Sequence, residues 1–241
     1  MAYPLREPTE APTTKSGLKR GESERHAPAC QAPNMPPPER TSAVFDANLY
    51  NSGCKHDRMD FDPTAYGPEV ARILALDGNG QRCVPLVCGP CRSPEARRAL
   101  KALKPAELFP GLREPEAPMA GLWLYFSCFE EAHNLIDNPK TTEGEYWHAV
   151  LHRQEPDAGN AAYWFRRVGQ HAIFPALATE AKEILKRHPD AEFRTGRWDP
   201  FAFVDFCERA RMQPGTTQEQ AAMQIQRAEW QLLFDYSARP Q

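Results

Sequence analysis

The chain of 241 residues has no apolar run that approaches the roughly 18 residues of a membrane-spanning helix. Its N-terminus, MAYPLREPTEAPTT, lacks the apolar core of a secretory signal. It also lacks a basic stripe, and its net charge of -3 disfavours a nucleic-acid-binding role. We therefore expect a cytoplasmic protein that binds neither membranes nor nucleic acid, and whose partner is a small molecule or another protein.

The seven cysteines lack the arrangement of a zinc knuckle, because no second CxxC motif or histidine pair follows Cys88-Gly-Pro-Cys91 nearby. Their odd number and the missing secretory signal predict reduced thiols. A thioredoxin-type redox role for Cys88 and Cys91 is an alternative, with a short strand expected over 82–87 before the motif and a helix after it.

Residues 1–40 contain eight prolines and a single aromatic residue, Tyr3. Charges of both signs are scattered there without a period, so the segment cannot bury enough apolar surface to offset its ordering entropy. We predict a disordered Pro-rich tail over 1–40 and one folded domain over 41–241. The core of this domain is expected within 116–241, which holds all five tryptophans.

Helix start and stop signals succeed one another along the domain, and alternating strand patterns are nearly absent. Thr142 with Glu145 and Thr216 with Glu219 are typical of capping boxes, and Asp157 is a further N-cap. The predicted class is all-α, a single domain of antiparallel hairpins with short loops. The expected helices cover 68–76, 93–103, 118–137, 143–153, 158–168, 175–187, 201–211 and 217–238.

The candidate chemistry lies on two successive helices. His148 and His152 are four residues apart and share a face, as in many metal sites, although Ala149 stands where zinc proteases with an HExxH motif have glutamate. In an antiparallel hairpin, His133 lies at the level of His148, and Glu130 lies near that of His152. We therefore expect these three histidines to bind a divalent metal ion, with Glu130 completing the site or acting as a base.

Glu145 is the second candidate catalytic carboxylate, since it precedes His148 by three residues as Glu130 precedes His133. Two facing Glu-x-x-His units resemble the ligand pattern of di-iron carboxylate bundles, but two further glutamates of that pattern are missing. Solvated helix ends and chance histidine spacing explain the same residues without a function.

The next helix and the residues that follow it carry candidate ligand-binding residues, Tyr163, Arg167 and His171. A guanidinium such as that of Arg167 binds an anionic substrate group in a bidentate manner. Alternatively, the arginines here pair with Glu155 and Asp157 or interact with the helix dipole before Gly169.

Residues 145–169 resemble a tetratricopeptide-type hairpin, in which the small Ala161 and Ala162 let two helices approach closely. The longer stretch GEYWHAVLHRQEPDAGNAAYWFRRVGQHAIF, residues 144–174, resembles a block of a family of bacterial cytoplasmic proteins with the pattern YWHA-x-x-HR-x-EPD … NA-x-YWFRRVG-x-H. The resemblance extends over roughly 40–241. It implies a shared fold and no activity, because none is assigned to that family.

The leading hypothesis is an enzyme or small-ligand binder whose cleft combines these histidines, glutamates, Tyr163 and Arg167. With a divalent ion, an activated water would serve hydrolytic or oxidative chemistry; without one, the same groups suit general acid–base work. The alternative is a non-catalytic tetratricopeptide-like module that binds a protein partner. The first predicts histidines that face inward and toward Arg167, and the second predicts outward histidines beside an exposed apolar groove.

Overall fold

The computed structural model describes residues 61–194 and 196–240, so the tail predicted over 1–40 lies outside the described residues, as do residues 41–60 of the predicted domain. Within the described ranges the chain forms ten α-helices, two short 3-10 helices and no strand, which confirms the all-α class. No helix in these ranges combines the length and apolar character needed to cross a bilayer.

The elements follow the order of the sequence signals, but within the described ranges ten α-helices and two 3-10 helices stand where eight helices were expected. They are η1 (Pro63–Tyr66), α2 (Pro68–Leu74), η2 (Ala75–Gly80), α3 (Pro94–Lys101), α4 (Pro105–Leu108), α5 (Glu116–Tyr125), α6 (Phe129–Leu135), α7 (Thr142–Gln154), α8 (Ala158–Val168), α9 (Phe174–Arg187), α10 (Pro200–Arg211) and α11 (Thr217–Ser237).

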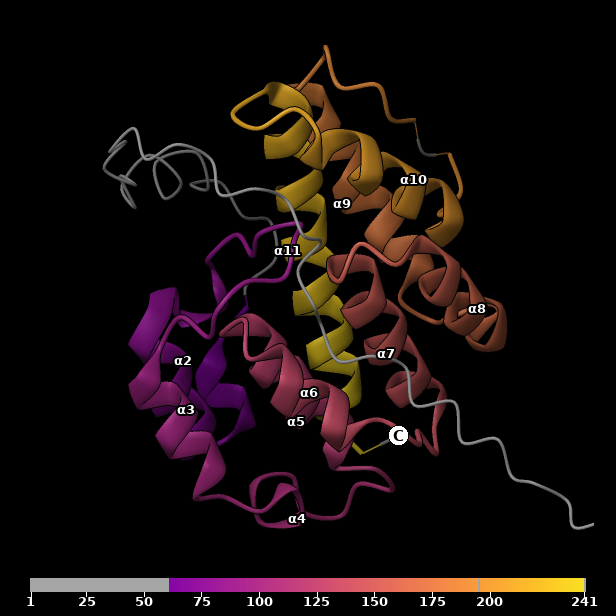
Figure 1. Ribbon diagram of the computed structural model, residues 1–241. Helices are drawn as coiled ribbons and strands as arrows, with labels where there is room; N and C mark the ends of the chain where they lie inside the picture. The colour runs from indigo at the N-terminus through magenta and orange to yellow at the C-terminus, as the bar shows by residue number, and fades with distance from the viewer. Residues whose placement is uncertain (1–60, 195, 241) are drawn as a thin grey trace, which may run out of the picture.

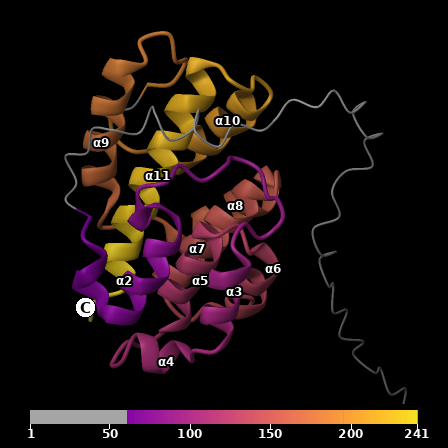
Figure 2. The same ribbon diagram turned by 90° about the vertical axis from the view of Figure 1, so that its left-hand side faces the viewer.

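Helix α11 is the axis of the fold. It packs against α9 and α10 over its first half and against α5 over its second half (Figures 1 and 2). Every residue from Ala221 to Gln231 is buried, although five of them are polar or charged. A helix enclosed on all sides is usually apolar all round, so these polar side chains require partners inside the protein.

Some of those partners are carbonyls of an irregular segment. Gln226 donates from Nε2 to the Val84 carbonyl at 3.0 Å, and Gln231 donates to the Gly80 carbonyl at 3.0 Å. The expectation of a short strand over 82–87 is wrong. Side chains of α11 take the place of a neighbouring strand in satisfying this backbone.

The single helix expected over 118–137 is also wrong, because the chain turns between α5 and α6. Ser127 adopts a left-handed conformation, with φ of 59°, and the Cys128 N–H donates to the Trp123 carbonyl at 2.9 Å. This is the Schellman arrangement that ends a helix. The apolar part of the predicted helix is therefore α5, and the polar part that carries His133 is the separate helix α6.

Most predicted caps are confirmed, and one shifts by a residue. Asp157 Oδ1 accepts from the Asn160 N–H at 3.0 Å, and Thr216 caps α11 with Glu219 reaching back to the Gly215 N–H at 2.7 Å. Helix α7, however, is capped by Thr141 and not by Thr142. The buried Glu114 carboxylate selects Thr141 by accepting from its N–H and its hydroxyl.

The expectation that all cysteines are reduced is wrong for one pair. Cys91 forms a disulfide with Cys128, and their Cα atoms lie 4.3 Å apart. The partner of Cys91 is therefore not Cys88, as a thioredoxin-type motif would require. The bond joins the segment before α3 to the N-cap residue of α6.

Candidate metal centre

Two helices supply the three histidines. His148 and His152 lie one turn apart on α7, and their rings stack with centroids 4.8 Å apart. His133 on α6 meets both rings edge-on, at centroid distances of 5.2 Å and 5.4 Å. One ring nitrogen of each histidine lies within 4.8 Å of one nitrogen of the others. Within 61–194 and 196–240, no other three His, Cys, Asp or Glu side chains form such a group.

His133 and His148 lie opposite each other on the two helices, as predicted for an antiparallel hairpin. Helices α6 and α7 leave and return through the short connection 136–141, so His133 and His148 lie at similar distances from it. On the other side of α7, Gly121 of α5 approaches so closely that a Cβ atom there would lie 2.6 Å from Trp147. This contact fixes the rotation of α7, and the face with His148 and His152 turns toward α6.

His148 is the most enclosed member of the cluster. Its ring stacks on Trp164 of α8 at 4.2 Å between centroids, and neither ring nitrogen has a hydrogen-bond partner. Burial, helped by the neighbouring imidazoles of His152 and His133, lowers the pKa of His148 to about 3. The nearby Ile136 backbone favours a higher pKa, but it forms no hydrogen bond to either ring nitrogen. His148 is therefore a neutral imidazole at pH 7, the form that binds metals.

His152 lies beside a carboxylate that the sequence did not point to. Its Nδ1 atom lies 3.0 Å from Oε2 of Glu155, although the angle at the nitrogen is poor for a hydrogen bond. Metal-binding histidines commonly donate their second N–H to a carboxylate, which fixes the tautomer and the ring orientation. Glu155 follows His152 by three residues, and this helical spacing was the available signal.

We expect Glu155→Gln to weaken metal binding by about 10–100-fold, the usual cost of losing such a carboxylate. The measurement is a zinc titration in competition with a chromophoric chelator. Glu95→Gln, which removes an exposed charge on the first turn of α3, is the matched control and should bind like the wild type. Equal affinity of Glu155→Gln and wild type would show that this carboxylate does not orient His152.

The two predicted carboxylates do not join the histidines. Glu130 is exposed on the first turn of α6, and Glu145 accepts a hydrogen bond from Arg167 Nε at 2.9 Å. Of the two predicted Glu-x-x-His units, only the histidines therefore face each other. Residues three apart differ in direction by about 60° around a helix. When His133 and His148 point toward each other, the glutamate three residues before each therefore points away from the opposite helix.

The predicted ligand-binding residues fall in two places. Arg167 lies over the ring of Trp164, 5.2 Å from its centroid, and Tyr163 is 48% exposed and edge-on to the same ring. Arg167 therefore borders the indole that covers His148, but its charge is already paired with Glu145.

His171 does not belong to this cluster. Its Nε2 atom lies 3.8 Å from Glu143, and its ring meets Tyr236 with centroids 5.0 Å apart. Glu143 and Tyr236 line a separate cavity of about 540 Å³ at the N-terminus of α7. The residues expected to line a single cleft are thus divided: the three histidines cluster, Glu145 lines this cavity with Glu143, and His171 lines another cavity, beside α9.

Comparisons of the chain with protein-family models, with curated proteins and with solved structures give no match.

Proposed function

We propose that the protein is a metal-dependent enzyme of the hydrolytic class, with a divalent ion held by His133, His148 and His152. The observation that carries the proposal is the convergence of three imidazoles from two helices, one of them buried with both nitrogens unpartnered. An unsatisfied buried polar group costs about 1–3 kcal/mol. A bond from the imidazole to a metal ion would offset that cost. Apolar side chains in the same places would never incur it, so the histidines are better explained by metal binding than by packing.

The donor set favours zinc. Imidazole nitrogens suit zinc, copper, iron and nickel, and a tetrahedral zinc site with 2.0–2.1 Å bonds has nitrogens about 3.4 Å apart. Ligand atoms within 4.8 Å of one another need to approach by at most about 1.4 Å, a movement within reach of side-chain rotation. Non-haem iron oxygenases use two histidines and a carboxylate, and no carboxylate belongs to this group in the described ranges.

Three protein ligands leave a coordination position for water, whereas purely structural zinc sites use four. A bound zinc ion would supply a water of lowered pKa as the nucleophile. The protein residues around it would be Trp164, which covers His148, Glu155, which lies beside His152, and Arg167, which lies over the ring of Trp164. An anionic substrate that displaces Glu145 from Arg167 would be held beside the ion.

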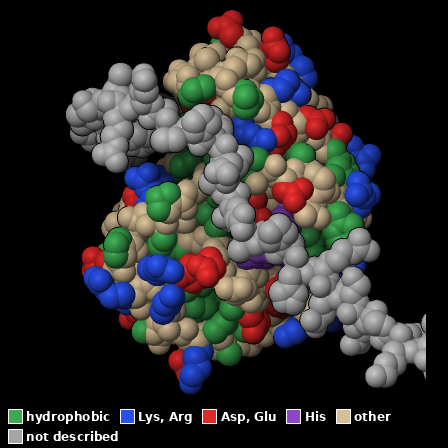
Figure 3. Space-filling model, viewed as in Figure 1, with side chains coloured by type: hydrophobic (Ala, Val, Ile, Leu, Met, Phe, Trp, Pro, Cys, Tyr) green, Lys and Arg blue, Asp and Glu red, His purple; other side chains and the backbone are tan. Residues whose placement is uncertain are grey.

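The alternative of a partner-binding module has less support. It predicts outward histidines and a continuous apolar groove, but His148 and His152 are 3% and 5% exposed. Exposed large apolar side chains in the described part of the chain lie on separate elements: Val87, Tyr163, Phe201 and Met212. On the face that Figure 3 shows, hydrophobic side chains form scattered small groups with acidic and basic side chains between them.

The test is metal content after purification without tag or chelator. We expect about one equivalent of zinc in the wild type, and its loss in His133→Ala and His152→Gln, with far-UV circular dichroism unchanged. His188→Ala, which removes a buried histidine outside the cluster, should retain the metal. Chromogenic carboxylate and phosphate esters, assayed with the same variants, report hydrolysis. Less than about 0.1 equivalent, with no thermal shift on adding zinc, would overturn the proposal.

A further inference from the structure

The CxxC segment lies between the two helices that carry the histidines. Its Cys88 N–H donates to the carbonyl of Gln154, the last residue of α7, at 2.6 Å. Its Arg92 N–H donates to the Phe126 carbonyl at the end of α5, at 2.9 Å, and Cys91 is bonded to Cys128. Residues 88–92, called the strap below, therefore connect the end of α7 to the start of α6.

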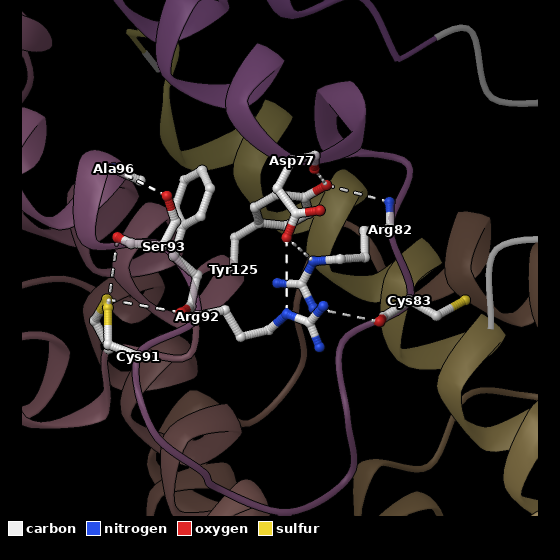
Figure 4. A network of polar contacts seen from close by, with 10 residues as sticks. Asp77, Arg82, Cys83, Cys91, Arg92, Ser93, Ala96 and Tyr125 are labelled. Carbon is white, nitrogen blue, oxygen red and sulfur yellow. Dashed lines mark hydrogen bonds and ion pairs between the residues drawn. A yellow bond between two sulfur atoms is a disulfide. The ribbon is translucent and has the colours of Figure 1, made fainter. Parts of the chain in front are cut away.

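The far side of the strap is held by a separate polar network. Asp77 lies between Arg82 and Arg92, at 2.6 Å and 3.9 Å, while the Tyr125 hydroxyl donates to the Asp77 carbonyl and accepts from the Arg82 N–H (Figure 4). Because these contacts do not involve either sulfur, they persist when the disulfide opens. The strap then keeps its place, and only its covalent bond to α6 is lost.

Besides the disulfide, the start of α6 is held by the turn from α5 and by burial of Phe129 and Ala132. The helix has seven residues, and its N-cap is Cys128, which makes no side-chain capping hydrogen bond. The first turn of α6 also carries Glu131, which forms ion pairs with Arg97 and Lys101 of α3 at 2.5 Å and 3.1 Å. His133 follows Cys128 by five residues, about 7.5 Å along the helix. The disulfide thus holds the start of the helix that supplies the third metal ligand.

We propose that the Cys91–Cys128 disulfide is a redox switch for the histidine site, an inference that rests on the proposed metal-dependent function. In the oxidised protein, α6 is held at the strap, and His133 is preorganised beside His148 and His152. In the reduced protein, the start of α6 is released, and metal binding must also order this helix. The oxidised form therefore binds the ion more tightly.

The chemistry of the switch is thiol–disulfide exchange with a dithiol reductant. One thiolate of the reductant attacks a sulfur of the disulfide and forms a mixed disulfide with that cysteine, releasing the other. The second thiolate of the reductant then attacks the mixed disulfide and releases the remaining cysteine. Two electrons and two protons pass to Cys91 and Cys128, which become thiols, and the reductant leaves as a disulfide. Disulfides in reducing compartments are typically of this reversible, redox-sensing kind.

The experiment compares zinc affinity in the two redox states by competition with a chromophoric chelator. A phosphine reductant opens the disulfide, taking one oxygen from water to form its oxide, and does not bind zinc as a dithiol would. We expect about tenfold weaker binding in the reduced wild type and in Cys91→Ser/Cys128→Ser. Cys207→Ser, which alters a buried thiol of α10, should bind like the oxidised wild type.

Linkage provides a second readout. If zinc binds the oxidised form tenfold more tightly, saturating zinc must lower the midpoint potential of the disulfide by about 30 mV, the value for a tenfold change in a two-electron couple. Zinc binding that is equal in both redox states would overturn the switch and leave the metal site standing. Failure of the oxidised wild type to bind zinc would remove the proposed function and the switch together. Global unfolding on reduction, seen by circular dichroism, would also overturn the switch, because the bond would then hold the whole fold.

Discussion

Arg153→Met is expected to lower the free energy of unfolding by about 3–5 kcal/mol, the usual cost of leaving a buried charge without its partner. Arg153 of α7 has no exposed surface, and its Nη1 donates to Glu229 Oε1 on α11 at 3.1 Å. A second donation, from Nη2 to Oε2, makes the contact bidentate. Arg153 therefore lies in the core, between α7 and α11.

The partner left behind causes this large effect. Without Arg153, the partner that Glu229 keeps among the described residues is the Tyr146 hydroxyl, which donates to Oε1 at 3.0 Å. The double variant Arg153→Met/Glu229→Leu removes both charges and should recover most of the loss. Urea denaturation of the three proteins measures the difference. A single variant within about 1 kcal/mol of the wild type would show that the pair is not what holds α7 to α11.

His148→Phe is expected to lower zinc affinity by more than about 100-fold while raising the stability of the metal-free protein by roughly 1 kcal/mol. The buried imidazole has no hydrogen-bond partner at either nitrogen, so a phenyl ring removes an unsatisfied group and keeps the stacking on Trp164. Opposite signs for function and stability are typical of a side chain retained for its chemistry.

Thermal denaturation in chelator and zinc titration provide the two measurements. The matched control is His171→Phe, because His171 Nδ1 accepts the Ile173 N–H at 3.3 Å. This control should lose stability and keep its zinc affinity. A His148→Phe protein destabilised by more than about 1 kcal/mol would indicate that the imidazole serves packing, and wild-type zinc affinity in that variant would exclude His148 as a ligand.

The loss of the predicted single helix over 118–137 shows where sequence reasoning reaches its limit. Apolar residues continue through Phe126, and no glycine or proline marks the turn at Ser127. The left-handed conformation of Ser127 is held by hydrogen bonds back to α5 and by burial of the turn. A residue other than glycine in this conformation costs about 1–3 kcal/mol, and it persists only where the surrounding structure enforces the conformation.

The sequence by itself determined the all-α class, most helix boundaries, and the common face of His148 and His152. These features depend on caps and periodicities that act within three or four residues. The loop length also indicated that His133 would reach that face. Only the tertiary structure decided that Glu155 lies beside His152, that Trp164 covers His148, and that Cys91 bonds to Cys128. Those pairings depend on the rotation and depth of each helix, which close packing across the whole core sets and which no local pattern records.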